Sequence, residues 1–151
     1  VLFNLAKRFD YIFENENKYP GAPSVIATEV INNESFKVKN LEVIPINTMH
    51  GNLQVYGYLI QDFVYLTDVK TIEEAEIEKI IGCSVLVINC LREEYHSTHF
   101  NLEEALHFIS LVRPKKTYLT HISHVFGFHE EIQAKLPDNV FVAYDNLTIN
   151  I

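Results

Sequence analysis

The apolar run at residues 84–90, SVLVINC, most constrains how this chain can fold. A continuous apolar run of this length is typical of a strand that is covered on both faces. The segment 102–112 repeats its apolar residues at helical spacing, and Asn101 with Glu104 forms a capping-box pattern at its start. Residues 116–120 then predict another strand, so strands and helices alternate in this part of the chain.

This alternation after Thr67 predicts an α/β fold with some antiparallel pairing. The 151 residues, 48% of them hydrophobic, suffice to bury one core, so we expect a single domain. The stretch before residue 25 reads as a short helix or strand that leads into a long loop. Other expected elements are strands at 25–31 and 41–47, a hairpin at 55–60 and 63–67, helices at 73–81 and 129–136, and closing strands at 140–144 and 147–151.

The composition limits which partners and which cellular environment we expect for this protein. A formal net charge of -8 argues against a non-specific grip on nucleic acid, which needs a basic surface. No run approaches the roughly 18 apolar residues of a membrane span, and no secretory signal pattern is present. Cys83 and Cys90 lack C-x-x-C spacing, so we interpret them as buried free thiols. We therefore expect a soluble, cytoplasmic protein.

Three strand-like runs are each followed by a potential metal ligand. VIPINTMH ends at His50, FVYLTD at Asp68 and KTYLTH at His121. In layered α/β folds, groups at the carboxyl ends of neighbouring strands face one crevice, so these side chains can converge. Two imidazoles and a carboxylate suit zinc, manganese or iron, and the two oxygens of Asp68 can bridge a metal pair. The alternative is that each is a turn or cap residue.

The other histidines differ in how firmly the sequence places them. His99 stands two residues before the predicted N-cap, which makes it a candidate general acid or phosphate contact, with a solvated loop residue as the alternative. Nothing in the sequence fixes His96. His107 lies off the apolar helix face and should meet solvent or another chain. We expect His124 and His129 to be capping or surface residues, and a hydrogen bond from His124 to a metal ligand stays open.

The segments GYLIQDFVYLTDV, HSTHFNLEEAL and KTYLTHISH, together with KYPGAP, resemble the metallo-β-lactamase superfamily. The likeness is greatest to its phosphodiesterases that cleave a phosphoribosyl cyclic phosphate, and tRNA 3′-processing endonucleases are more distant relatives. The resemblance implies that His50 binds the first metal and that Asp68 is shared by both. It also implies that His121 binds the second metal, while His99 contacts the phosphate or protonates the leaving group.

The chain departs from this superfamily in one respect, because the principal metal-binding motif, H-x-H-x-D-H, is absent. In the family that motif lies upstream, in a part of the fold that would precede Val1. We therefore expect residues 1–151 to form a single partial domain, the C-terminal portion of an αββα sandwich. The complete protein would then hold two divalent ions, Zn or Mn, whereas this chain alone could not hold both tightly and would have poor or absent turnover.

The preferred hypothesis is a metal-dependent phosphodiesterase that acts on a small cyclic or diester phosphate. Its catalytic residues would be His99 and Asp68, and its metal ligands in this chain would be His50, Asp68 and His121. A tRNA 3′-processing-type endonuclease is an alternative, although the acidic balance counts against RNA. A non-catalytic fragment or assembly domain is another. We expect no nucleic-acid or membrane partner, and a homodimer is left open.

Overall fold

The computed structural model describes residues 1–13 and 20–150 and divides the chain into two compact units, Val1–Ile31 and Asn32–Ile151. The first unit contains the helices α1 (Leu2–Arg8) and α2 (Asp10–Phe13), and neither helix has a buried residue. Part of the loop predicted before residue 25 falls at 14–19, outside the described residues.

The strand predicted at residues 25–31 is wrong. These residues form neither helix nor strand, and the side chain of Ile26 is 95% exposed. The segment has the β-branched composition of a strand, but no described strand pairs with it. Strand propensity is expressed through packing against neighbouring strands, so the composition alone does not produce one here.

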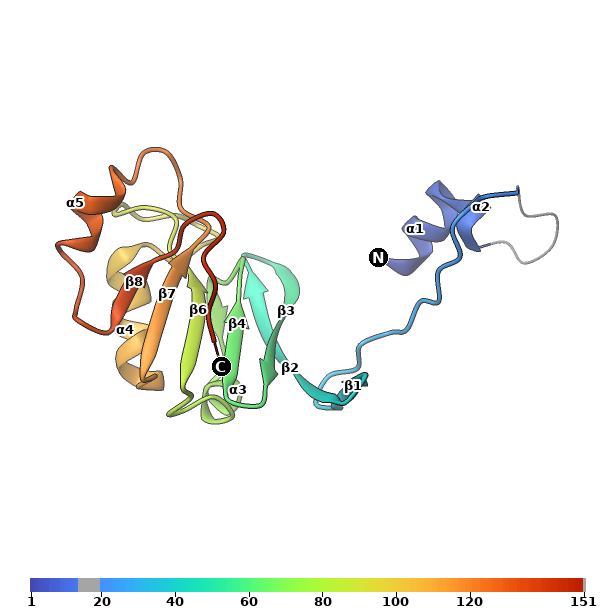
Figure 1. Ribbon diagram of the computed structural model, residues 1–151, viewed down its shortest axis with the longest axis horizontal. Coiled ribbons are helices and arrows are strands. Elements are labelled where there is room, and N and C mark those ends of the chain that lie inside the picture. Colours follow the sequence, from blue (N-terminus) through green and yellow to red (C-terminus); the bar gives the residue numbers. More distant parts are fainter. Residues whose placement is uncertain (14–19, 151) are drawn as a thin grey trace. The chain divides into compact units, whose positions relative to one another are not determined.

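The second unit is built on one eight-stranded sheet, shown in Figure 1. The spatial order is β1-β2-β3-β4-β6-β7-β8, and β5 pairs with β2 outside this path. The strands are β1 (Phe36–Val38), β2 (Leu41–His50), β3 (Leu53–Ile60), β4 (Phe63–Leu66), β5 (Thr71–Ile72), β6 (Val85–Asn89), β7 (Lys116–Thr120) and β8 (Val140–Val142). The helices are α3 (Glu74–Glu78), α4 (Leu102–Val112) and α5 (His129–Gln133).

Strand direction decides which residues can meet. β2 pairs antiparallel with β3, and β3 pairs antiparallel with β4, which confirms the predicted hairpin. β4, β6, β7 and β8 then pair in parallel. Consequently β2, β4, β6, β7 and β8 all run the same way, and their carboxyl ends lie along one side of the sheet. We call this side the carboxyl edge.

The predicted closing pair of strands is also wrong. β8 pairs in parallel with β7, with Thr117 opposite Val140, and residues 147–150 form no strand. The backbone N–H of Leu147 donates to the carbonyl of Tyr144 over 3.1 Å, which closes a turn after β8. Residues 147–150 do not pair with β8 after this turn; Ile151 lies outside the described residues.

Helix α4 covers one face of the sheet, as the sequence predicted. Its first turn has the full capping box, in which the Asn101 side chain accepts from the Glu104 backbone and the Glu104 side chain accepts from the Asn101 backbone. Burying each large apolar side chain stabilises the fold by roughly 1.5–3 kcal/mol. The buried residues of α4 and the sheet residues in the same core include Ala105, Phe108, Ile109, Val112, Leu66, Leu86, Ile88 and Leu119.

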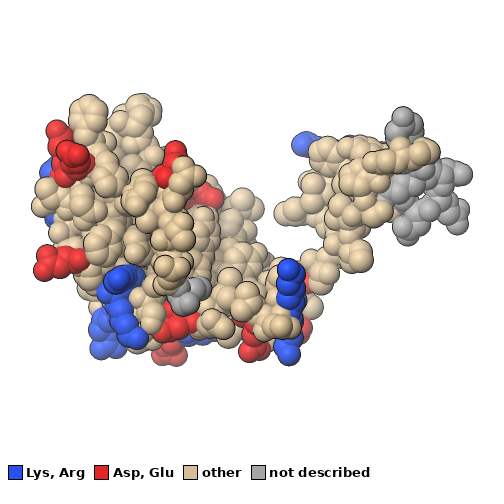
Figure 2. Space-filling model, in the orientation of Figure 1, with Lys and Arg blue, Asp and Glu red and all other residues tan. Residues whose placement is uncertain are grey.

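Alternate strand residues point to the other face of the sheet, where Tyr65 is 42% exposed and pairs with Tyr58 across β3 and β4. Figure 2 shows a face on which the charged side chains of this unit gather mainly along the lower border, while the centre is uncharged. No described helix is long and apolar enough to cross a membrane.

Candidate metal centre

Four side chains singled out from the sequence meet at the carboxyl edge. His50 ends β2, Asp68 follows β4, His121 follows β7, and His99 comes from the loop between β6 and α4. Ligand atoms of His50, Asp68 and His99 all lie within 4.8 Å of one another. The Nε2 atom of His99 is 3.0 Å from Asp68 Oδ1, and that of His121 is 3.5 Å from the same oxygen. The structure brings the four together, and their roles stay predictions.

The loop that carries Asp68 is held by a buried asparagine. Asp68 has φ 57°, a left-handed conformation that costs a non-glycine residue roughly 1–2 kcal/mol. The next residue, Val69, donates its backbone N–H to Asn89 Oδ1 over 2.7 Å, and Asn89 Nδ2 donates to the Val69 carbonyl over 3.0 Å. Asn89 is fully buried. Its amide therefore holds the backbone immediately after Asp68 in place.

The sequence contained a signal for Asn89 that the sequence analysis did not use. It is the only polar residue in the run VLVIN of β6, every residue of which is buried. A buried amide needs hydrogen-bond partners, so an asparagine at the end of such a run indicates a structural contact with a neighbouring loop.

His121 has the same backbone conformation as Asp68, with φ 58°. The backbone on either side is held by main-chain bonds, since the N–H of Cys90 donates to the carbonyl of Thr120 and the N–H of Ser123 donates to that of Leu91, both over 2.9 Å. Its side chain is 42% exposed. The imidazole thus lies at the surface of the site and does not enter the apolar core.

His99 lies at the centre of a group of imidazoles and is 8% exposed. Its ring centroid is 4.4 Å from that of His50 and 4.7 Å from that of His121, on which it stacks. Burial lowers the pKa of His99 below its ordinary 6.5, against the opposing effect of the Asp68 hydrogen bond. The neutral imidazole is therefore favoured at neutral pH, and it can act as a ligand or hydrogen-bond partner.

His96, which nothing in the sequence fixed, lies against His99 in the structure. Its Nδ1 atom is 3.2 Å from His99 Nδ1 and accepts from the backbone N–H of Thr98 over 3.3 Å. The Oγ1 atom of Thr98 is also 3.0 Å from His99 Nδ1. The Thr98 carbonyl is 3.2 Å from His50 Nδ1, so this loop contacts two of the central imidazoles.

The turn after His50 can approach this loop because it contains Gly51. Gly51 has φ 61°, and a Cβ atom at this position would be 3.0 Å from the methyl group of Thr98. Both the left-handed backbone and the close approach favour glycine.

Lys70 ties the Asp68 loop to the start of α4. Its Nζ atom donates to the two carboxylate oxygens of Glu104 over 2.6 and 2.7 Å and to the His99 carbonyl over 3.3 Å. The same ammonium lies 4.3 Å from the ring centroid of Tyr95. Since Glu104 also completes the capping box, one carboxylate joins the helix start to the loop beside Asp68.

The remaining histidines and the cysteines lie outside this group. His107, His124 and His129 are exposed, as predicted, and His129 Nε2 is 3.1 Å from the Val142 carbonyl. Cys83 and Cys90 are buried free thiols, which confirms the prediction. Burial raises the pKa of Cys83 to about 11 and that of Cys90 to about 12, so neither is a reactive thiolate at neutral pH.

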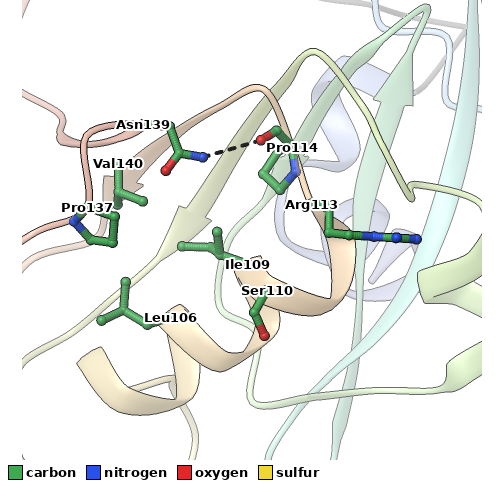
Figure 3. Close-up of a pocket in the computed structure, with 8 residues that line it drawn as sticks. All are labelled: Leu106, Ile109, Ser110, Arg113, Pro114, Pro137, Asn139 and Val140. Carbon is green, nitrogen blue, oxygen red and sulfur yellow. Dashed lines mark hydrogen bonds between the residues drawn. The ribbon is translucent and has the colours of Figure 1, made fainter.

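A cavity of about 410 Å³ lies elsewhere, between the C-terminal end of α4 and the loop that leads into β8. Figure 3 shows it, with Leu106, Ile109 and Val140 in its wall and a 3.4 Å hydrogen bond from Asn139 Nδ2 to the Pro114 carbonyl. Because these residues precede β7 and β8, the cavity is at the opposite side of the sheet from the carboxyl edge. It contains none of the predicted site residues.

The donor set fits a divalent transition metal. Zinc takes imidazole nitrogen and carboxylate oxygen at about 2.0–2.2 Å, which places two tetrahedral donors roughly 3.4 Å apart. The 3.5 Å separation between Asp68 Oδ1 and His121 Nε2, two of the proposed ligand atoms, matches this requirement. Imidazole nitrogen and carboxylate oxygen also bind manganese and iron, so the donor set does not select one of these metals.

Comparison with known proteins decides the family. Residues 1–122 match the model of the beta-lactamase superfamily domain. The chain belongs to this superfamily. The resemblance stated from the sequence motifs is therefore confirmed, and so is the α/β fold of the metallo-β-lactamase type.

Solved structures agree with this assignment. A diphosphatase of the PhnP family is 30% identical with a TM-score of 0.83, over 97% of this chain and 54% of that one. The metallo-β-lactamase fold protein YhfI from Bacillus subtilis is 19% identical with a TM-score of 0.67, over 91% of this chain and 58% of that one. The short form of human tRNase Z is 18% identical with a TM-score of 0.60, over 80% and 48%. The last two show the fold alone.

A curated relative carries a different name. The octanoyltransferase of Porphyromonas gingivalis is 36% identical over 148 residues, which cover 97% of this chain and 30% of that protein. This chain thus spans about half the length of the solved relatives and less than a third of the curated one.

Proposed function

We propose that this chain provides one part of the active site of a metal-dependent hydrolase that cleaves small phosphodiesters. The observation that carries the proposal is the meeting of His50, Asp68 and His99 within 4.8 Å at the carboxyl edge, with His121 3.5 Å from Asp68. Residues that come from separate strands and loops converge on one carboxylate, as a metal centre requires.

When bound, divalent ions would polarise a phosphoryl oxygen of the substrate and lower the pKa of a water molecule, which would make that water a better nucleophile. In our proposal Asp68 would be shared by two such ions, and His50 and His121 would each help to hold one. His99 is buried beside Asp68, where it would contact the phosphate or, in its protonated form, deliver a proton to the leaving oxygen.

The identity of the metal belongs to the proposal. The donor set of imidazole nitrogen and carboxylate oxygen suits both Zn²⁺ and Mn²⁺, and we propose one of these. This chain lacks an H-x-H-x-D-H segment and spans 54% of the PhnP-family diphosphatase. We therefore propose that further ligands complete the centre in the whole protein and that this chain alone turns over poorly.

A small phosphodiester is the substrate class that the surroundings favour. Asp68 and His121 have side chains 44% and 42% exposed, so a ligand can reach them from solvent. The similar PhnP-family protein is described as a diphosphatase, which supports chemistry at phosphorus. The net charge of -8 counts against RNA, the substrate of the tRNA-processing alternative, whose structural likeness shows only the fold.

The name octanoyltransferase indicates acyl transfer, but two observations make hydrolysis the better proposal for this chain. The match leaves about two-thirds of that protein uncovered, so the named activity need not reside in the shared part. Acyl transfer through a cysteine needs a thiolate of lowered pKa, whereas burial raises the pKa of both Cys83 and Cys90. A non-catalytic assembly domain is another alternative. A homodimer is compatible with the preferred proposal and with each of its alternatives.

The test is metal content together with bis-p-nitrophenyl phosphate hydrolysis. Both are measured for this chain and for a longer polypeptide that adds an H-x-H-x-D-H segment. We expect the longer protein to bind a transition metal and to lose activity on His121→Ala, while His107→Ala, at an exposed position, retains it. Absence of metal from the longer protein, or full activity of His121→Ala, contradicts the proposal.

A further inference from the structure

A second cavity adjoins the candidate metal centre at the carboxyl edge. It has a volume of about 240 Å³ and is lined by Thr120, His121, Ile122, Ala143, Tyr144 and Asp145. His121 belongs to both places, since its imidazole forms part of the cavity wall and lies 3.5 Å from Asp68 Oδ1. A substrate bound at the metal centre can therefore extend into this cavity past His121.

Strand direction explains why Asp145 is there. β8 runs parallel to β7, so the residues that follow it emerge at the carboxyl edge, as His121 does after β7. The N–H of Ala143 donates to the Leu119 carbonyl over 2.9 Å and extends this pairing toward the cavity. Asp145 is thus a further end-of-strand carboxylate, which the sequence analysis did not consider.

Two features of the cavity indicate the charge of its ligand. Asp145 is exposed and makes no hydrogen bond or ion pair with any other described residue. Beside it, Tyr144 is 61% exposed, and its ring is placed by an edge contact with His129 at 6.1 Å between centroids. An unpaired carboxylate next to an accessible aromatic ring attracts an ammonium group through charge and through the face of the ring, and it repels a second anion.

We propose that this cavity is a subsite for a cationic group, an ammonium-bearing alcohol, esterified to the phosphate that the metal centre binds. The inference rests on the proposed function and narrows its substrate to phosphodiesters that carry a positive charge. Asp145 determines specificity in this proposal: it pairs with the ammonium and takes no part in the chemistry at phosphorus.

The test compares inorganic phosphate with phosphocholine as ligands of the zinc-loaded longer polypeptide, the one that adds an H-x-H-x-D-H segment, by NMR titration of backbone amides. We expect phosphocholine to bind more tightly and to shift the amides of residues 143–146. Asp145→Asn should reduce the advantage of phosphocholine over phosphate by about fivefold, the size of one exposed ion pair or cation–π contact. Asp138→Asn is the matched control, because Asp138 is an exposed aspartate just before β8, at the other end of the same strand.

The outcomes separate this inference from the proposed function. If neither anion binds, the proposed metal centre fails, and a choline chloride titration then decides the subsite by the same amide shifts. Equal binding of both ligands, or an unchanged ratio in Asp145→Asn, overturns the subsite alone. A loss of zinc affinity of tenfold or more in Asp145→Asn also overturns it, because the carboxylate would then be a metal ligand. If the protein binds thymidine 5′-phosphate more tightly than phosphocholine, and this preference is lost in Asp145→Asn, the proposal that the cavity takes a cationic group is overturned.

Discussion

The loops that carry Asp68 and His121 follow the same four-residue pattern and are held in different ways. YLTD ends β4 and YLTH ends β7, with Leu66 and Leu119 fully buried and the last residue of each pattern at φ 57° or 58°. Both leucines are opposite Ile88, so the loops leave the sheet on either side of β6. The repeated sequence thus produces two equivalent backbone turns next to each other.

The difference lies in how β6 holds the two loops. Its last residue, Asn89, uses a side-chain amide to bind Val69 after the first turn, whereas the next residue, Cys90, uses its backbone N–H to bind Thr120 before the second. Asp68 is also beside Lys70, which is tied to Glu104. The loop that carries Asp68 therefore has specific side-chain support, whereas the loop that carries His121 depends on main-chain bonds that any sequence could make.

Asp68→Asn should have the largest effect on the metal centre. Asp68 Oδ1 lies 3.0 Å from His99 Nε2 and 3.5 Å from His121 Nε2, so Asp68 is the residue that two of the imidazoles share. In the longer polypeptide that adds an H-x-H-x-D-H segment, we expect Asp68→Asn to weaken zinc binding by more than about 100-fold and His121→Asn to weaken it by a smaller factor. Competition with a chromogenic chelator measures both dissociation constants. Equal losses for the two variants would show that the supported carboxylate is not the dominant ligand.

Asn89→Ala should have the next largest effect. It removes two buried hydrogen bonds and leaves the N–H of Val69 without a partner, while the Val69 carbonyl keeps the bond from the Phe100 N–H. We expect the free energy of unfolding to fall by about 1–3 kcal/mol. Zinc affinity should fall about tenfold, the range for residues that support a ligand. Urea denaturation and chelator competition measure the two effects.

Ser123→Ala is the matched control for Asn89→Ala on the His121 side. Ser123 lies in that loop, and its buried Oγ atom has no partner among the described residues. We expect a change below about 0.5 kcal/mol and unchanged zinc affinity. Hydrogen exchange at the Val69 N–H should rise in Asn89→Ala and stay the same in Ser123→Ala. Unaltered exchange in Asn89→Ala would refute a role for Asn89 in holding this loop.

The smallest expected effect concerns pH and His99. The pKa of His99 in the folded, metal-free protein lies below its ordinary 6.5, so the unfolded chain takes up the proton first. The associated stability is present above pH 6.5 and is lost as the pH falls through the folded pKa. His99→Gln should flatten this loss in denaturation curves recorded with chelator, and His107→Gln should not. An unchanged slope in His99→Gln would assign the effect to other groups.

The sequence predicted those parts of the fold in which local pattern and tertiary packing agree. The α4 start was predictable because Asn101 and Glu104 satisfy each other within one turn. The β3–β4 hairpin was predictable because only Gln61 and Asp62 separate its strands. The failures at 25–31 and 147–150 share a physical cause. Both segments have strand composition, but a strand needs a partner, and composition does not reveal whether one is present.

The candidate site divides in a similar way. His50, Asp68 and His121 were found because strand ends converge at one edge, an argument that needs only strand direction. The contacts of His96 and Asn89 could not be derived in this way, because they depend on how one loop lies against another. Asp145 was missed because β8 was expected to form an antiparallel hairpin, which would not have suggested a ligand at its end.

The shared carboxylate of Glu104 has a mechanical consequence. It both caps α4 and anchors the ammonium of Lys70, so fraying of the first helical turn and displacement of the Asp68 loop draw on the same group. Opening of either one therefore disturbs a carboxylate that the other also uses. A ligand that restricts the motion of Asp68 should thus also reduce fluctuations at the start of α4. Conversely, fraying of the helix at residues 101–104 should increase the motion of the Asp68 loop.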